Sequence, residues 1–191
     1  SGNPKMGQRS FLLKHTDGLY AKGNYIRNFD ANGTFLDQTR QQHGLILDLS
    51  GEANRINMFQ VFPTVTNEEG TAIDKKKSYN LHIQKLKSIF KLLNSEATGD
   101  DLTTFGDMLN EFYIEEGLWA RNPKLNPEKL KATDLVNEEY PILSDFILFA
   151  DDYKRSLMMQ SNPDEIEIKS VNRIYKTFNE LLTTNEEMFE G

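Results

Sequence analysis

The sequence contains no cysteine, which excludes disulfide bonds and thiolate metal sites and fits a reducing compartment. No apolar run approaches the roughly 20 residues that cross a bilayer, and no secretory leader pattern is visible. The chain also lacks an initiator methionine, so we expect it to be a piece of a longer protein. These absences favour a cytoplasmic globular segment.

Composition narrows the class of protein further. The 191 residues are 38% hydrophobic and 27% charged, as in ordinary globular domains, which is enough for one good core or two small ones. The net charge of −7 is uneven, because residues 63–191 carry 15 basic and 24 acidic side chains. This acidic part disfavours direct binding of nucleic acid. The only basic run, Lys75–Lys77, is expected to be the solvated start of a helix.

The first third of the chain alternates between helical and β-rich patterns. We expect a helix at Ser10–Ala21 that Gly23 ends with a left-handed cap, and a second helix at Thr34–Gln42. The short apolar runs Tyr25–Phe29 and Leu45–Leu49 predict strands. Strand, helix and strand with short connections indicate a parallel βαβ unit, which must be part of a larger sheet because its edges would otherwise be bare.

The remainder is helical in pattern. Four amphipathic segments predict a compact all-α domain, with Thr98 and Asp101 as a capping box for the second segment and Asn162 as the N-cap of the fourth. Their apolar stripes run through Tyr79, Ile83, Leu86, Phe90 and Leu93; Leu102, Phe105, Met108, Leu109 and Phe112; Leu143, Phe146, Ile147, Ala150 and Tyr153; and Ile168, Val171, Ile174, Phe178 and Leu181. The sequence therefore predicts two domains, 1–62 and 63–191, in a mainly α chain.

Few side chains have the spacing of catalytic or metal sites. The histidines His15, His43 and His82 lie at no ligand spacing, so we expect them to be structural. Adjacent acids point in different directions on a helix and do not form an acid/base pair. Trp119 is expected to pack in the core, with a partner contact as the alternative, and the connector 121–135 has room for a short helix. We therefore expect no catalytic residue and no metal ligand in this chain.

The opening stretch is the remaining chemical signal. Gly2 and Gly7 have the separation of the glycines in a phosphate-binding loop, and a helix follows them. Gln8 occupies the position of the lysine that reaches the phosphates, Arg9 comes next, and the hydroxyl of Ser10 arrives one residue late. The stretch is either a degenerate nucleotide site or a coincidence of glycine spacing.

Two separate motifs resemble a known family. The first is GNYIRNFDANGTF at 23–35, and the second is RINMFQV at 55–61, with a later PILSDF element at 141–146. In this order they resemble the large conjugation ATPases of type IV secretion systems. These are the enzymes of the TraC/TraE/TrsE type, and the resemblance is to those of Gram-positive conjugative systems. Thr34 and Met58 depart from the family pattern, where an acid and a proline are common.

The resemblance implies a fragment of an ATPase. It implies a partial RecA-like α/β segment at 1–62 with a degenerate phosphate loop at Gly2, Gly7, Gln8, Arg9 and Ser10, with Asp30 just beyond the next strand. Residues 63–191 would be a helical insertion domain. By this resemblance the parent would bind ATP and Mg²⁺ and assemble as a hexamer of its own copies. It would also contact other secretion components at the cytoplasmic face of the membrane and power conjugative transfer of DNA or protein or channel assembly.

The chain itself is expected to bind nucleotide weakly or not at all. It lacks the phosphate-loop lysine, and no Walker B strand with its acid pair is visible in it. The alternative hypothesis is a non-catalytic helical protein–protein interaction module whose opening loop is fortuitous.

Overall fold

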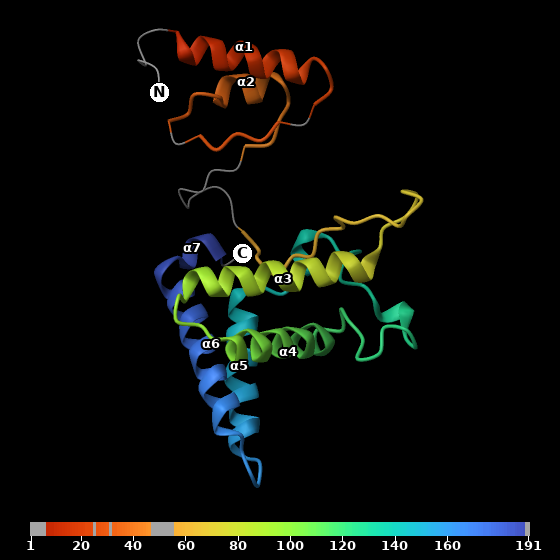
Figure 1. The fold of residues 1–191 in the computed structure, drawn as a ribbon, viewed down its shortest axis with the longest axis vertical. Coiled ribbons are helices and arrows are strands. Elements are labelled where there is room, and N and C mark those ends of the chain that lie inside the picture. Colours follow the sequence, from red (N-terminus) through yellow and green to blue (C-terminus); the bar gives the residue numbers. More distant parts are fainter. Residues whose placement is uncertain (1–6, 25, 31, 47–55, 190–191) are drawn as a thin grey trace. The chain divides into compact units, whose positions relative to one another are not determined.

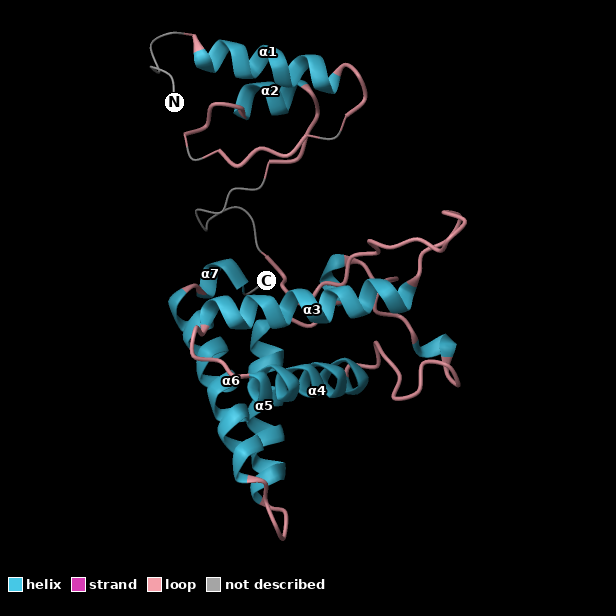
Figure 2. Cartoon of the chain, viewed as in Figure 1, coloured by secondary structure: helices cyan, strands magenta, loops and turns pink. Residues whose placement is uncertain are grey.

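The structure is a computed structural model that describes residues 7–24, 26–30, 32–46 and 56–189. The chain forms two compact units, Ser1–Leu49 and Ser50–Gly191, which are described separately. Within the described ranges the regular structure is entirely helical, as Figure 2 shows, so the mainly α prediction is confirmed.

The predicted βαβ unit is not found in the described residues. Residues 26–29 and 45–46 form loops, while Tyr25 and residues 47–49 lie outside the described ranges. A strand is stable only beside a paired neighbour that satisfies its N–H and C=O groups, and the described part of the first unit supplies none. The two short apolar runs therefore form no strand in the part of them that the structure describes.

The first unit contains two helices, α1 (Gln8–Tyr20) and α2 (Leu36–Gln41). Gly23 ends α1 as predicted, because its φ of 78° is left-handed and its N–H donates to the Tyr20 carbonyl at 2.8 Å. The predicted helix at Thr34–Gln42 is present but slightly shorter.

The buried side chains in the described part of this unit are polar. The described residues of the first unit that are buried are Thr16 and Gln38. The Gln38 amide of α2 donates to the Leu13 carbonyl at 2.7 Å and to Asp17 Oδ1 at 2.6 Å on α1. Several large apolar side chains are exposed instead: Phe11, Leu12, Leu19, Tyr20, Phe29, Leu36 and Leu45. The contact between these two helices therefore depends on hydrogen bonds.

The second unit contains the four predicted amphipathic helices. They are α3 (Lys75–Leu93), α4 (Gly99–Glu115), α5 (Leu143–Met158) and α6 (Glu165–Thr184), followed by the short α7 (Glu186–Phe189). The connector after α4 holds two single-turn 3-10 helices, η1 (Pro127–Lys129) and η2 (Asn137–Glu139). Helices α5 and α6 form an antiparallel hairpin, and α4 packs across it (Figure 1).

Aromatic side chains dominate the core of this unit. Phe146 of α5 lies at the centre, with ring centroids 5.2 Å from Phe59, 5.4 Å from Phe112 and 5.5 Å from Phe178. Phe105 of α4 joins the same cluster. The predicted stripes supply this core, because their apolar residues recur at helical spacing on the faces that meet.

Local caps fix where the helices begin. Thr98 and Asp101 form the predicted capping box of α4. The N-cap of α6 is Asp164, whose carboxylate accepts from the N–H groups of Ile166 and Glu167, so the prediction of Asn162 is wrong by two residues. Asp164 is the better cap because its charge also lies at the positive end of the helix.

The segment 56–62 belongs structurally with the helices. Met58, Phe59 and Val61 are buried in the core of the second unit, although the sequence assigned them to the first domain. The N–H of Ile56 donates to the carbonyl of Met188 at 2.9 Å. The first and last described parts of this unit therefore lie side by side.

Candidate functional site

The predicted phosphate loop leads into the N-terminus of α1. Gly7 is the N-cap residue with a left-handed φ of 81°, and its carbonyl accepts from the N–H of Phe11 at 2.9 Å. Gln8, Arg9 and Ser10 form the exposed first turn, which contains no acidic residue. Gly2 lies outside the described residues. The structure therefore shows a glycine directly before a helix, while the phosphate loop and nucleotide binding there stay predictions.

Asp30 has a local role in the structure. Its carboxylate accepts hydrogen bonds from the N–H of Phe35 at 2.7 Å and of Asn32 at 3.2 Å. The bond from Phe35 is the main reason that the pKa of Asp30 lies below its ordinary value. These bonds shape the turn that leads into α2, and a further role of Asp30 near a nucleotide stays a prediction.

Two of the motif segments that carry the family resemblance contact each other. The Asn57 side chain donates to the Pro141 carbonyl at 2.9 Å and accepts from the N–H of Phe59 at 2.9 Å. Phe59 then packs on Phe146, the last residue of the 141–146 element. The structure therefore joins the motif at 55–61, of which Arg55 lies outside the described residues, to the start of α5.

A buried polar chain lies beneath these motifs. The Tyr113 hydroxyl donates to the Phe59 carbonyl at 2.6 Å, so His82 Nε2, at 2.7 Å from the same hydroxyl oxygen, must be the donor in that contact. Nδ1 of His82 is then an unprotonated acceptor, and it has no partner in the described part of the chain. Burial, with a smaller contribution from Lys85, lowers the pKa of His82 to about 3. The expectation of a structural histidine agrees with this arrangement.

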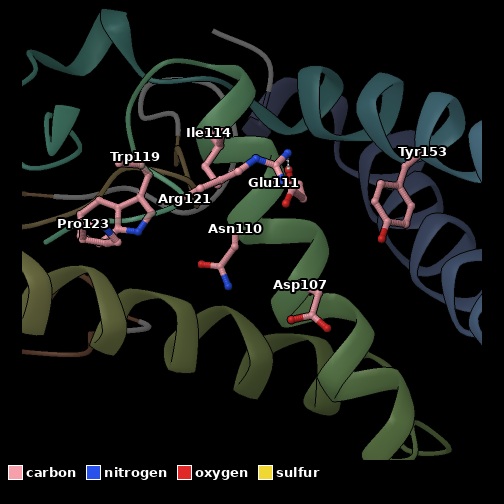
Figure 3. Close-up of a pocket in the computed structure, with 9 residues that line it drawn as sticks. Asp107, Asn110, Glu111, Ile114, Trp119, Arg121, Pro123 and Tyr153 are labelled. Atoms are coloured by element: carbon pink, nitrogen blue, oxygen red, sulfur yellow. Dashed lines mark hydrogen bonds and ion pairs between the residues drawn. The ribbon is translucent and has the colours of Figure 1, made fainter. Parts of the chain in front are cut away.

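A hollow lies beside α4 in the second unit (Figure 3). It has a volume of about 550 Å³ and is lined by α4, by the segment after it and by Tyr153 of α5. One end is apolar, with Ile114, Trp119 and Pro123. Trp119 is buried and stacks on Tyr79 at a centroid distance of 3.8 Å, which confirms its predicted packing role.

The other end of the hollow is charged. The Arg121 guanidinium forms an ion pair with Glu111 Oε2 at 2.5 Å, and Asp107 lies one turn earlier on α4. The Tyr153 hydroxyl donates to Glu167 Oε1 at 3.0 Å. The pKa of Tyr153 is raised to about 12, chiefly by burial and also by Glu167, with smaller contributions from the negative charges of Asp107 and Glu111.

Sequence reasoning missed this hollow. The spacing of Asp107, Asn110 and Glu111 places three polar side chains on one face of α4, and this was the available signal. Tyr153 was assigned to the apolar stripe of its segment, and only the packing of α5 against α4 reveals its second role.

No group of three or more histidine or acidic side chains with the geometry of a metal site occurs among residues that the structure describes. None of the helices in those ranges combines the length and apolar character needed to cross a bilayer.

Comparison with known proteins adds two findings, while no family model matches the chain. The uncharacterized protein pXO2-09 of Bacillus anthracis is 33% identical over 196 aligned positions, which cover 98% of this chain and 29% of that protein. The structure of VirB4 of Thermoanaerobacter pseudethanolicus aligns with all of this chain at a TM-score of 0.67 and 17% identity. This chain spans 44% of that VirB4 chain. The described fold is therefore similar to part of VirB4.

Proposed function

We propose that this chain is part of a type IV secretion ATPase, in which the second unit is a helical insertion that contacts other components. The observation that carries the proposal is the fold likeness to VirB4 along the whole chain. The motifs at 23–35, 55–61 and 141–146 support it independently, because they are features of the amino-acid sequence and not of the fold.

The architecture of the second unit supports an insertion. An inserted domain must begin and end at neighbouring points so that it does not disrupt its host. The hydrogen bond from Ile56 to Met188 meets this requirement. The unit also has its own aromatic core, as an independently folding domain needs.

In this proposal the first unit occupies the phosphate position of the parent ATPase. Helix α1 begins directly after Gly7, and its first turn contains no acidic residue that would repel a phosphate. The parent would bind ATP and Mg²⁺, work as an oligomer at the cytoplasmic face of the membrane and energise transfer through the secretion channel. This chain alone would not hydrolyse ATP.

A nucleotide titration tests the phosphate position. We would add a fluorescent ATP analogue with Mg²⁺ to the native chain and to Gln8→Lys, and follow anisotropy. Weak or undetectable binding by the native chain and a gain of about tenfold or more in the variant would support the proposal, because the new ammonium would reach the phosphates.

A matched variant controls for charge alone. Gln160→Lys makes the same substitution at an exposed position in the second unit, after α5. An equal gain in both variants, or no gain in a Gln8→Lys chain that circular dichroism shows to be folded, would contradict a phosphate-loop geometry at α1.

A non-catalytic interaction module is the second candidate function. The hollow beside α4 favours it, because concave surfaces with a few convergent polar groups are common binding sites. The two candidates are compatible if the helical unit serves as the contact surface of a larger ATPase.

A further inference from the structure

The charged end of the hollow beside α4 is not neutralised. Asp107 is exposed, and its carboxylate makes no hydrogen bond or ion pair with any residue that the structure describes. Glu111 has Arg121 as its partner, and the Tyr153 hydroxyl is engaged by Glu167. One carboxylate is therefore available to a ligand, in a hollow whose lining carries two acids, Asp107 and Glu111, and one base, Arg121.

The local field favours a cation. Burial and the contact with Glu167 are the main reasons that the pKa of Tyr153 is raised, and the negative charges of Asp107 and Glu111 raise it a little further, so these charges act across the hollow. An anionic ligand would meet repulsion here. A bare metal ion is also disfavoured, since the described side chains form no cluster with metal-ligand geometry.

The chain itself shows which kind of cation the wall accepts. Arg121 places a guanidinium against Glu111 at 2.5 Å, at the rim of this hollow. Asp107 lies four residues before Glu111 on α4, and so faces the same side of the helix. A second guanidinium or ammonium group would find the same type of acceptor at Asp107, one helical turn away from Glu111.

A smaller hollow continues the surface toward α3. It has a volume of about 330 Å³ and shares Asp107 and Asn110 with the first one. Its other polar walls are mostly neutral, from Asn80, Gln84 and Thr103, and such groups can hydrogen-bond the amides of an extended backbone. Lys87 supplies the one positive charge among the residues that line this end.

We propose that these two hollows form a binding groove for an extended protein segment that places an arginine or lysine side chain beside Asp107. The backbone on one side of that residue would run past Asn110 toward α3. Lys87 would disfavour a second basic residue at that end, so the preferred segment carries an isolated basic side chain. The inference rests on the proposed role of the second unit as a contact surface and names the chemistry of its partner.

The experiment is an NMR titration of the whole chain with defined probes. N-acetyl-arginine amide is compared with N-acetyl-citrulline amide, which has nearly the same shape without the charge. The tetrapeptide Ac-Gly-Gly-Arg-Gly-amide tests the extended backbone. We expect the arginine probe to shift the amide signals of 107–114 and 153, the citrulline probe to shift them little, and the tetrapeptide to extend the shifts to 80–84 and 103.

Two charge-neutralising variants on α4 separate a site from general attraction. Asp107→Asn removes the available carboxylate, and we expect the affinity for the tetrapeptide to fall about tenfold, as for loss of one charge-assisted hydrogen bond. Glu115→Gln removes an exposed charge on the same helix outside both hollows, and we expect a change of less than about twofold. Both positions are exposed, so the variants should fold.

Two outcomes would overturn the inference. Shifts spread over all acidic surfaces, or equal losses in both variants, would mean non-specific attraction. Absence of binding by every probe would reject the groove while leaving the nucleotide titration unaffected, because that titration reports on α1 in the other unit. Failure of this inference and failure of the proposed ATPase role are thus distinguishable.

Discussion

The two units of this chain bury different kinds of side chain. The second unit closes around a cluster of phenylalanines, whereas the buried side chains in the described part of the first are a threonine and a glutamine. Burial of an aromatic side chain stabilises a fold by several kcal/mol, while a net hydrogen bond contributes about 1 kcal/mol. The second unit therefore buries enough apolar surface to fold by itself. The first unit would become more stable if another protein surface covered its exposed apolar side chains.

The largest expected effect is at the centre of the aromatic cluster. Phe146→Ala should lower the free energy of unfolding of the second unit by about 3–5 kcal/mol, because it removes a fully buried ring and leaves a cavity. Urea unfolding followed by the fluorescence of the single tryptophan, Trp119, measures it.

Phe11→Ala is the matched control in the first unit. The Phe11 side chain is 68% exposed, so its removal should change the unfolding free energy by less than about 0.5 kcal/mol. Similar costs at both positions would mean that the contrast between the units does not hold.

The second effect depends on pH and concerns the buried His82. Its pKa is about 3 in the folded chain and about 6.5 when unfolded, so the unfolded chain takes up the proton first. Stability from this residue is fully present above pH 6.5 and is lost as the pH falls, by about 1.4 kcal/mol per pH unit well below 6.5. Urea unfolding at pH 7, 6 and 5 measures the slope.

His82→Gln isolates this contribution. Glutamine retains an N–H donor for the Tyr113 hydroxyl but cannot be protonated. We expect the variant to lose the part of the pH slope due to His82, and His15→Gln, at an exposed position of the first unit, to retain it. An unchanged slope in His82→Gln would contradict a buried neutral histidine.

The smallest effect tests the polar contact of the first unit. Gln38→Ala removes the hydrogen bonds to Leu13 and Asp17, and we expect the local opening of α1 and α2 to become easier by about 1 kcal/mol. Hydrogen exchange at the amides of these helices measures it. The urea midpoint of the second unit should stay the same, and a shift there would show that the units are energetically coupled.

The sequence predicted the helices better than the strands for a physical reason. The four long segments repeat their apolar residues over several turns, and a strand or a loop does not produce this spacing. The runs at 25–29 and 45–49 are only five residues long, so their apolar pattern does not repeat. A strand also needs a neighbouring strand to pair with, which the local sequence does not specify. Caps were predictable where the side chain and the spacing coincide, as at Thr98, and uncertain where two candidates lie close together, as at Asn162 and Asp164.

The candidate sites follow the same logic. The helix start after Gly7 was visible because glycine spacing and a helical pattern are local features. The hollow beside α4 was not, because Tyr153, Trp119 and Asp107 come from three separate segments that only tertiary packing brings together. The contact between Asn57 and Pro141 was hidden for the same reason, although each segment had been noticed by itself.

That contact has a consequence for how this domain can vary among relatives. Asn57 and Pro141 are 84 positions apart, and their hydrogen bond makes the chain return to its starting point after α3, α4 and the connector. Insertions or deletions within the exposed connector around 122–129 would then leave the Asn57–Pro141 junction in place. We therefore expect natural length differences to gather in the connector, while position 57 keeps a side chain that can donate to the backbone carbonyl of residue 141.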